Sequence, residues 1–281
     1  MLCFKKLLFL FLTITMSTVV FAERGIDVTS KLNRIALIIG NANYESSPLK
    51  NPVNDANDMA YVLKQKGFAV TLLKDASQRQ MEKAIKNFGV SLRNGGVGLF
   101  FYAGHGMQVN GINYLIPIGS NIELEEDIKY DSVNANRVLT LMESADNEFN
   151  MVFLDACRNN PFSRSFRSGS RGLAQMDAPT GSLIAYATAP GSIAADGNGR
   201  NGLFTGQLIK HMQVPDLELT KMMKEVRKQV LKESENKQTP WDVSSLTGDF
   251  YFTGGNDQGT TIIEVDEPKK QLVQKTPTAA S

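Results

Sequence analysis

The sequence predicts an α/β fold with a mostly parallel central sheet that helices cover on both faces. Short β-branched runs alternate along the chain with amphipathic helical stretches, and turn residues separate them. Hydrophobic residues make up 42% of the 281 residues and charged residues 21%, which is typical of a globular domain with a buried core. A net charge of +1 without a basic run argues against a nucleic-acid-binding protein.

Local signals set the expected boundaries of these elements. Pro52 favours the first position of a helix, and Gly67 is placed to end it. Ser77 and Gln80 form a capping box for the next helix, and Asn110-Gly111 is typical of a two-residue hairpin turn. The predicted strands span 34–39, 68–73, 97–102, 150–154 and 183–187, and the predicted helices span 52–66, 77–88, 135–145, 203–211 and 218–232.

The first 22 residues have the pattern of a secretory signal peptide. Lys5 and Lys6 precede an apolar stretch over 7–21, and Ala22 closes a cleavage pattern with small residues. The alternative is a membrane anchor, but the stretch is shorter than the ~20 residues that a spanning helix needs and is diluted by Thr and Ser. We therefore expect an exported chain, periplasmic or secreted, that begins at Glu23. A single domain is expected over 31–253, followed by a disordered tail over 254–281.

Removal of this segment would take away Cys3 and leave Cys157 as the sole cysteine. An unpaired cysteine in an oxidising compartment is a liability unless it is buried or has a chemical role. Cys157 follows the fourth predicted strand, and His105 follows the third. Because ligands bind beyond the carboxyl ends of parallel strands, we expect both at one rim of the sheet.

This pair has the chemistry of a peptidase. A thiolate is a nucleophile, and a nearby imidazole can deliver the proton that a leaving amine needs. The backbone N–H groups of Gly106 and Cys157 are candidates for an oxyanion hole. The bland alternatives are a cysteine that packs as a small apolar group and a histidine that satisfies a loop. The other histidine, His211, is expected near a helix end.

Two motifs resemble those of caspase-like peptidases: Tyr-Ala-Gly-His-Gly at 102–106 and Leu-Asp-Ala-Cys-Arg-Asn at 154–159. The caspase signature Gln-Ala-Cys-Arg-Gly also has its histidine about 50 residues upstream. The resemblance, which is to bacterial caspase homologues, covers roughly residues 31–253. It implies a caspase-like three-layer α/β/α sandwich, a Cys–His dyad formed by Cys157 and His105, and protein or peptide substrates.

One departure from the caspase signature bears on specificity. Caspases, which cleave after aspartate, have glutamine at the position of Asp155, whereas metacaspases and paracaspases have an acid there and cleave after arginine or lysine. The resemblance therefore implies an acidic substrate pocket of Asp155 and Asp55, with Asp196 as a third candidate and arginine preferred over lysine. The alternatives without a binding role are that Asp55 lies in the first turn of a helix, where an acid favours the helix dipole, and that Asp196 lies in a turn before Gly197.

Parts of the sequence are also compatible with two other classes of function. Residues 197–202 formally match the G-x-G-x-x-G pattern of nucleotide-binding proteins, but the preceding strand is expected to end too early, so we interpret them as a flexible loop bordering the pocket. A catalytically silent caspase fold that acts as a binding or regulatory module is the main alternative.

Related caspases are cut between their subunits, and Arg164, Arg167 and Arg171 would be the matching sites for self-processing. No cofactor or metal is predicted, and there is no acidic loop of EF-hand spacing, although metacaspases often need calcium.

Overall fold

The computed structural model describes residues 33–93, 95–157, 172–189 and 199–254. The predicted signal peptide, the C-terminal tail, Asp196 and the three arginines of the processing hypothesis lie outside these residues. The helices and strands are β1 (Arg34–Gly40), α1 (Pro52–Gln65), β2 (Ala69–Lys74), α2 (Gln78–Leu92), β3 (Val97–Val109), β4 (Ile112–Leu115), a 3-10 turn (Glu125–Asp127), α3 (Ile128–Asp131), β5 (Val133–Asn134), α4 (Asn136–Glu143), β6 (Phe149–Cys157), β7 (Ser182–Tyr186), α5 (Leu203–His211), α6 (Leu219–Glu233) and β8 (Trp241–Ser244).

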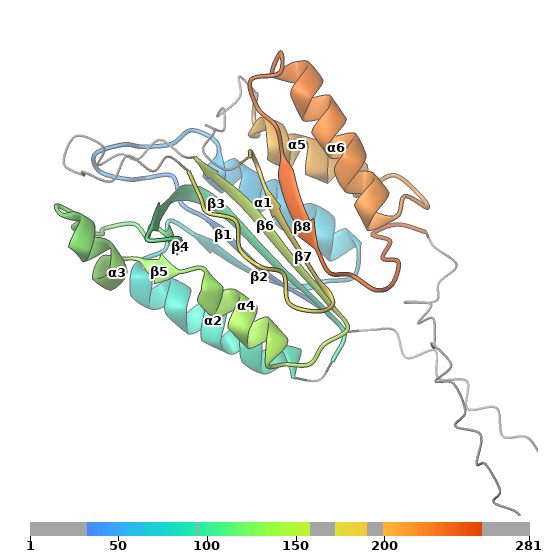
Figure 1. Ribbon diagram of the computed structural model, residues 1–281, viewed down its shortest axis with the longest axis horizontal. Coiled ribbons are helices and arrows are strands. Elements are labelled where there is room, and N and C mark those ends of the chain that lie inside the picture. Colours follow the sequence, from blue (N-terminus) through green and yellow to red (C-terminus); the bar gives the residue numbers. More distant parts are fainter. Residues whose placement is uncertain (1–32, 94, 158–171, 190–198, 255–281) are drawn as a thin grey trace, which may run out of the picture. The chain divides into compact units, whose positions relative to one another are not determined.

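A mostly parallel sheet forms the middle layer, in the order β2-β1-β3-β6-β7-β8. The first five of these strands run parallel, and β8 joins the edge antiparallel to β7. Helices cover both faces of the sheet, with α1, α5 and α6 on one side and α2 and α4 on the other (Figure 1). The predicted fold class is confirmed, although the antiparallel edge strand β8 was not predicted.

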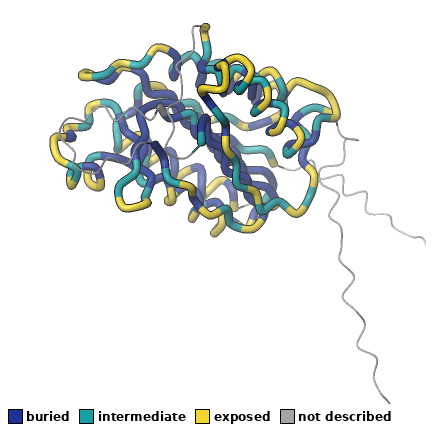
Figure 2. The backbone as a smooth tube through the Cα atoms, turned by 45° about the horizontal axis from the view of Figure 1, so that its top comes forward, coloured by how far each residue is buried: buried dark blue, intermediate teal, exposed yellow. Residues whose placement is uncertain are grey.

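Alternation along the strands divides the core between the two faces. In β3, Leu99 and Phe101 pack under α1 and α5, whereas Phe100 and Tyr102 face α2 and α4. All four side chains are fully buried, and Figure 2 shows the central strands as the most buried part of the described chain. Strands buried on both faces lack a polar side, which is why they read as continuous apolar runs in the sequence.

The local signals fixed several boundaries correctly. The Gln80 side chain accepts a hydrogen bond from the Ser77 N–H at 2.9 Å, which confirms the predicted capping box. Gly67 follows α1 with a φ of 79°, and Asn110 and Gly111 have φ values of 51° and 79°. Both turn residues thus have the positive φ that a type I′ hairpin requires, and this hairpin joins β3 to β4.

The third strand is longer than predicted. It was expected to end at Tyr102, but β3 continues to Val109, and its last residues from Gly106 pair with β4. The glycines of the 102–106 motif, which favour a turn when considered alone, are instead held extended by neighbouring strands on either side. His105 therefore lies within a strand, on the segment where β3 leaves the sheet core for the hairpin.

Candidate active site

His105 and Cys157 lie opposite each other on adjacent strands. Strands β3 and β6 are parallel and in register from Val97 and Phe149 onward, and the last pair of this ladder is His105 with Cys157. The 52 residues that separate them in the chain are thus closed by strand pairing. The side chain of Cys157 lies outside the described part of the structure.

The imidazole of His105 is held by the loop between β1 and α1. It is 3% exposed, and its Nε2 lies 2.7 Å from the backbone carbonyl oxygen of Ser47. Because a carbonyl only accepts hydrogen bonds, Nε2 carries the hydrogen in this contact. In the neutral ring the basic lone pair is then on Nδ1, the atom that can receive a proton from a thiol.

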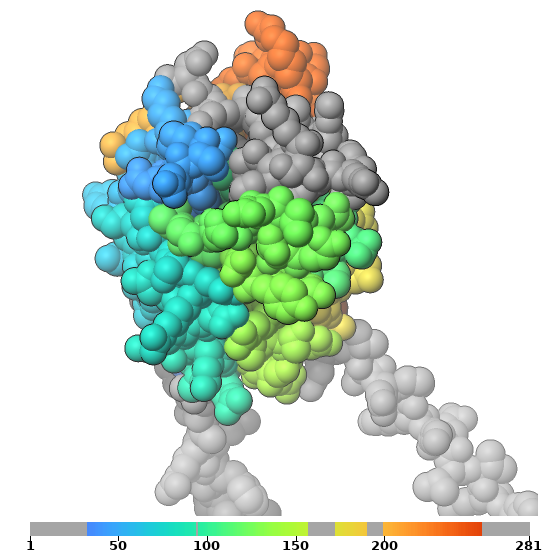
Figure 3. Space-filling model, turned by 90° about the vertical axis from the view of Figure 1, so that its left-hand side faces the viewer, coloured from blue at the N-terminus to red at the C-terminus, as the bar shows by residue number. Residues whose placement is uncertain are grey.

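Tyr44, in the same loop, fixes the ring and the backbone of His105. The two ring centroids are 4.4 Å apart, and the Tyr44 hydroxyl accepts from the His105 N–H at 3.0 Å. The same hydroxyl donates to the carbonyl of Ile116 at 2.9 Å. In Figure 3 the blue segment near the start of the described chain borders green segments from the middle of the chain. The sequence analysis missed Tyr44 and Ser47 because neither belongs to a motif.

Gly104 makes this arrangement possible. A Cβ atom at residue 104 would lie 2.7 Å from the Tyr102 hydroxyl and 2.8 Å from the Tyr44 hydroxyl, which is closer than real contacts allow. Tyr102 uses its hydroxyl to donate to the His105 carbonyl at 2.7 Å. Two tyrosines therefore bind the N–H and the carbonyl of the same histidine, and only glycine at 104 leaves room for both.

The backbone N–H of Gly106, one of the two predicted oxyanion donors, does not bond to the neighbouring hairpin strand. Ile116 donates its N–H to the His105 carbonyl at 3.0 Å, and Gly106 pairs with Leu115 across the hairpin. In an antiparallel ladder this pattern makes Gly106 and Leu115 a pair whose own N–H groups point away from the partner strand. The Gly106 N–H is therefore directed away from β4, on the side of β3 where β6 pairs.

Asp55 and Asp155 come together around Gly202. Asp55, 2% exposed in the first turn of α1, accepts from the Gly202 N–H at 3.0 Å. Asp155, on β6, accepts from the Thr205 hydroxyl at 2.5 Å. A Cβ atom at Gly202 would stand 3.2 Å from an Asp155 oxygen and 3.5 Å from an Asp55 oxygen. The two carboxylates therefore flank Gly202 at the start of α5.

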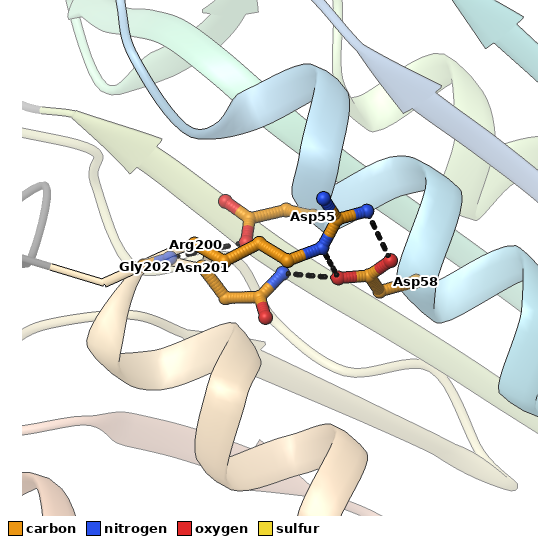
Figure 4. Close-up of polar contacts among 5 residues, drawn as sticks. All are labelled: Asp55, Asp58, Arg200, Asn201 and Gly202. Atoms are coloured by element: carbon orange, nitrogen blue, oxygen red, sulfur yellow. Dashed lines mark hydrogen bonds and ion pairs between the residues drawn. The ribbon is translucent and has the colours of Figure 1, made fainter.

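A second acidic residue on α1 binds the segment that leads into Gly202. Arg200 makes a bidentate contact with Asp58, with nitrogen–oxygen distances of 2.8 and 2.9 Å, and Asn201 adds a hydrogen bond of 3.0 Å (Figure 4). The Arg200 hydrogen bond holds the pKa of the Asp58 carboxyl below its ordinary value. The contact between Asp58 and Arg200 was not predicted, because no local pattern relates positions 142 residues apart.

The remaining candidates are placed as follows. Of the residues that match G-x-G-x-x-G, the structure describes 199–202, and Gly202 directly precedes the first residue of α5. The last strand described before them, β7, ends at Tyr186. His211 lies in the last turn of α5, where its Nδ1 contacts the Gln207 carbonyl at 2.8 Å. Within the described ranges, no helix is long and apolar enough to cross a membrane, and no three potential metal ligands gather.

This α/β/α sandwich, with its paired histidine and cysteine strands, has the architecture of a caspase domain. The caspase domain family (peptidase C14) matches residues 33–251, and the chain belongs to this family of cysteine peptidases. It is similar to mucosa-associated lymphoid tissue lymphoma translocation protein 1 of Homo sapiens, with 27% identity over 208 residues, which are 73% of this chain and 24% of the human protein. The Mus musculus homolog is 27% identical over 198 residues, 69% of this chain and 23% of the mouse protein. The chain thus spans about a quarter of the length of these relatives.

Proposed function

We propose that this protein is a cysteine endopeptidase that cleaves after basic residues, arginine in preference to lysine, with Cys157 and His105 as its catalytic dyad. The observation that carries the proposal is that Asp55 and Asp155 flank Gly202. Asp155 lies on β6 only two residues before Cys157. A space flanked by two carboxylates attracts a cation and repels an anion.

The neighbouring positions of His105 and Cys157 on β3 and β6 support the following mechanism. The Cys157 thiol gives its proton to Nδ1 of His105, and the sulfur attacks the carbonyl carbon of the substrate peptide. The negative charge that develops on the carbonyl oxygen is stabilised by the N–H groups of Gly106 and Cys157. His105 then protonates the leaving amine as the C–N bond breaks, which leaves an acyl-enzyme. Water, losing a proton to His105, releases the acid and restores the thiol.

The Ser47 carbonyl supports the protonated state of this cycle. When His105 accepts a proton on Nδ1, the ring becomes cationic, and its Nε2–H strengthens its bond to Ser47. The contact also prevents the ring from rotating, so that Nδ1 keeps its direction through both proton transfers. The 3% exposure of the residue further shields this proton from bulk water.

The preference for arginine follows from the geometry of hydrogen bonding. Guanidinium is planar and offers several donors, so it can bond both Asp55 and Asp155, whereas an ammonium group presents a compact charge. Aspartate before the scissile bond would be rejected, because like charges brought together at a buried site cost several kcal/mol, roughly a thousandfold or more in rate. Asp196 remains a third candidate for the same pocket.

A matched series of fluorogenic peptides that differ only in the residue before the cut tests the proposal. We expect cleavage after arginine to exceed cleavage after lysine, and no cleavage after aspartate. Cys157→Ala and His105→Ala should each abolish most activity, and Asp55→Asn and Asp155→Asn should depress cleavage after arginine without unfolding the chain. A folded wild type that cleaves none of the peptides would favour the catalytically silent binding module instead.

We also propose that the chain is exported. The support is the signal pattern over residues 1–22, which is followed by a chain with one cysteine. N-terminal sequencing of protein recovered outside the cytoplasm should return Glu23, and recovery of a chain that begins at Met1 would contradict the proposal.

A further inference from the structure

Helix α1 presents two carboxylates to the segment that precedes α5. Asp55 and Asp58 are three residues apart, which places them on one face of the helix, one turn from each other. Gly202 binds the first through its N–H, and Arg200 binds the second through its guanidinium (Figure 4). Among these contacts, the positive charge beside the two carboxylates is therefore the guanidinium of Arg200, a residue of the chain itself.

The Arg200 charge lies within the electrostatic reach of both carboxylates. Its pKa is raised first by the hydrogen bond to Asp58 and by the charge of Asp58, and the charge of Asp55 also contributes. Arg200 is two residues from Gly202, whose N–H is 3.0 Å from Asp55. The long, flexible Arg200 side chain has two carboxylates on α1 near it, Asp55 and Asp58, and the structure shows it bound to Asp58.

The exposure of the pair indicates what it does. The Arg200 side chain is 63% exposed and that of Asp58 is 27% exposed, and exposed ion pairs contribute little to folding stability. The main effect of the ion pair is therefore to fix where the Arg200 guanidinium lies. Its bidentate geometry, with Asn201 as a further donor to the same carboxylate, favours Asp58 over any site that offers a single oxygen.

We propose that Asp58 is a specificity-positioning residue that holds Arg200 one helical turn away from Asp55, so that the chain's own guanidinium does not compete with the substrate's arginine for the acidic pocket. This inference rests on the proposed cleavage after basic residues. It assigns Asp58 a role through Arg200, with no contact to the substrate. Without its counter-ion, Arg200 would turn to the nearest remaining carboxylate, Asp55, and would act as a tethered competitive inhibitor.

The test compares Asp58→Asn, Arg200→Gln and the double variant on arginine and lysine peptides. In Asp58→Asn we expect KM for the arginine peptide to rise about tenfold with little change in kcat, which corresponds to a pocket left open about one-tenth of the time. Arg200→Gln should restore KM in the double variant to within about threefold of wild type, because the competing cation is gone. Glu82→Gln, which breaks a similarly exposed pair with Arg137 on the other face of the sheet, is the matched control.

Two results with these variants would overturn the inference. If Asp58→Asn leaves KM unchanged, Arg200 does not enter the pocket. If the double variant is as impaired as Asp58→Asn, the ion pair stabilises the segment before α5 and does not keep Arg200 out of the pocket. Thermal unfolding midpoints within about 4 °C of wild type would confirm that the variants are folded. A wild type without preference for basic residues would refute the pocket itself, and the inference with it, before any variant is made.

Discussion

Replacing Gly202 with alanine would test whether the space between Asp55 and Asp155 receives the substrate. Gly202 has φ −60° and ψ 150°, a conformation that any residue adopts, so the backbone does not require glycine here. It is also the N-cap of α5, where Ser, Thr, Asp or Asn would serve better. The nearness of the two carboxylates is the remaining reason for glycine, because an added methyl would stand 3.2 Å from Asp155 and 3.5 Å from Asp55.

The expected magnitudes separate activity from stability. Alanine at an allowed φ and ψ stabilises a protein by about 0.4–1 kcal/mol through its unfolded state, and the poorer N-cap offsets a similar amount. The free energy of unfolding should thus change by less than about 1 kcal/mol. In the pocket, the methyl would displace the guanidinium from at least one carboxylate, a loss of about 1.5–3 kcal/mol for a hydrogen bond between charged groups. We therefore expect kcat/KM on the arginine peptide to fall about 10- to 150-fold.

Steady-state kinetics on the arginine and lysine peptides, combined with urea unfolding, measures both effects. Cleavage after lysine should fall less, because the compact ammonium group needs less of the space. Gly206→Ala is the matched control, since Gly206 lies within α5 and its added Cβ would lie 3.8 Å from the Cβ of Asn201, an ordinary contact. A Gly202→Ala enzyme that is folded and cleaves after arginine at the wild-type rate would refute the placement of the pocket.

Three further outcomes follow from the site. Tyr44→Phe removes the acceptor of the buried His105 N–H, and we expect a loss of about 1–3 kcal/mol in urea unfolding, with a lower kcat and little change in KM. Thr205→Val removes the hydroxyl that donates to Asp155, and calorimetry should show a destabilisation of about 1.5–3 kcal/mol; an unchanged midpoint would contradict the hydrogen bond. Because the pKa of Asp58 is lowered in the fold, its carboxylate contributes stability above its unfolded pKa near 3.8 and loses it as the pH falls through the folded value. The stability difference between wild type and Asp58→Asn, under about 1 kcal/mol at pH 7, should therefore vanish in acid, and a difference that grows as the pH falls would be contrary to the sign of the shift.

The sequence alone determined the features that depend on near neighbours along the chain. The β-branched runs, the apolar helical faces, the capping box of Ser77 and Gln80 and the turn at Asn110-Gly111 are all set within a few residues, so the α/β class and most boundaries were predictable. The placement of His105 beside Cys157 was also predictable, because parallel strands bring their carboxyl ends to one edge. The extension of β3 was not, because the glycines of the 102–106 motif become extended only when neighbouring strands pair with them.

Only the tertiary structure decided which distant residues complete the site. The Ser47 carbonyl reaches the His105 ring across 58 residues, and the Gly202 N–H reaches Asp55 across 147. These contacts depend on the position of β1 between β2 and β3 and on the packing of α5 against α1, which are settled by the burial of whole faces and not by any short pattern. Neither Tyr44 nor Asp58 has a local signature, because a tyrosine in a loop and an acid in a helix are common. Their partners give them their chemistry, and the order and register of the strands bring those partners together.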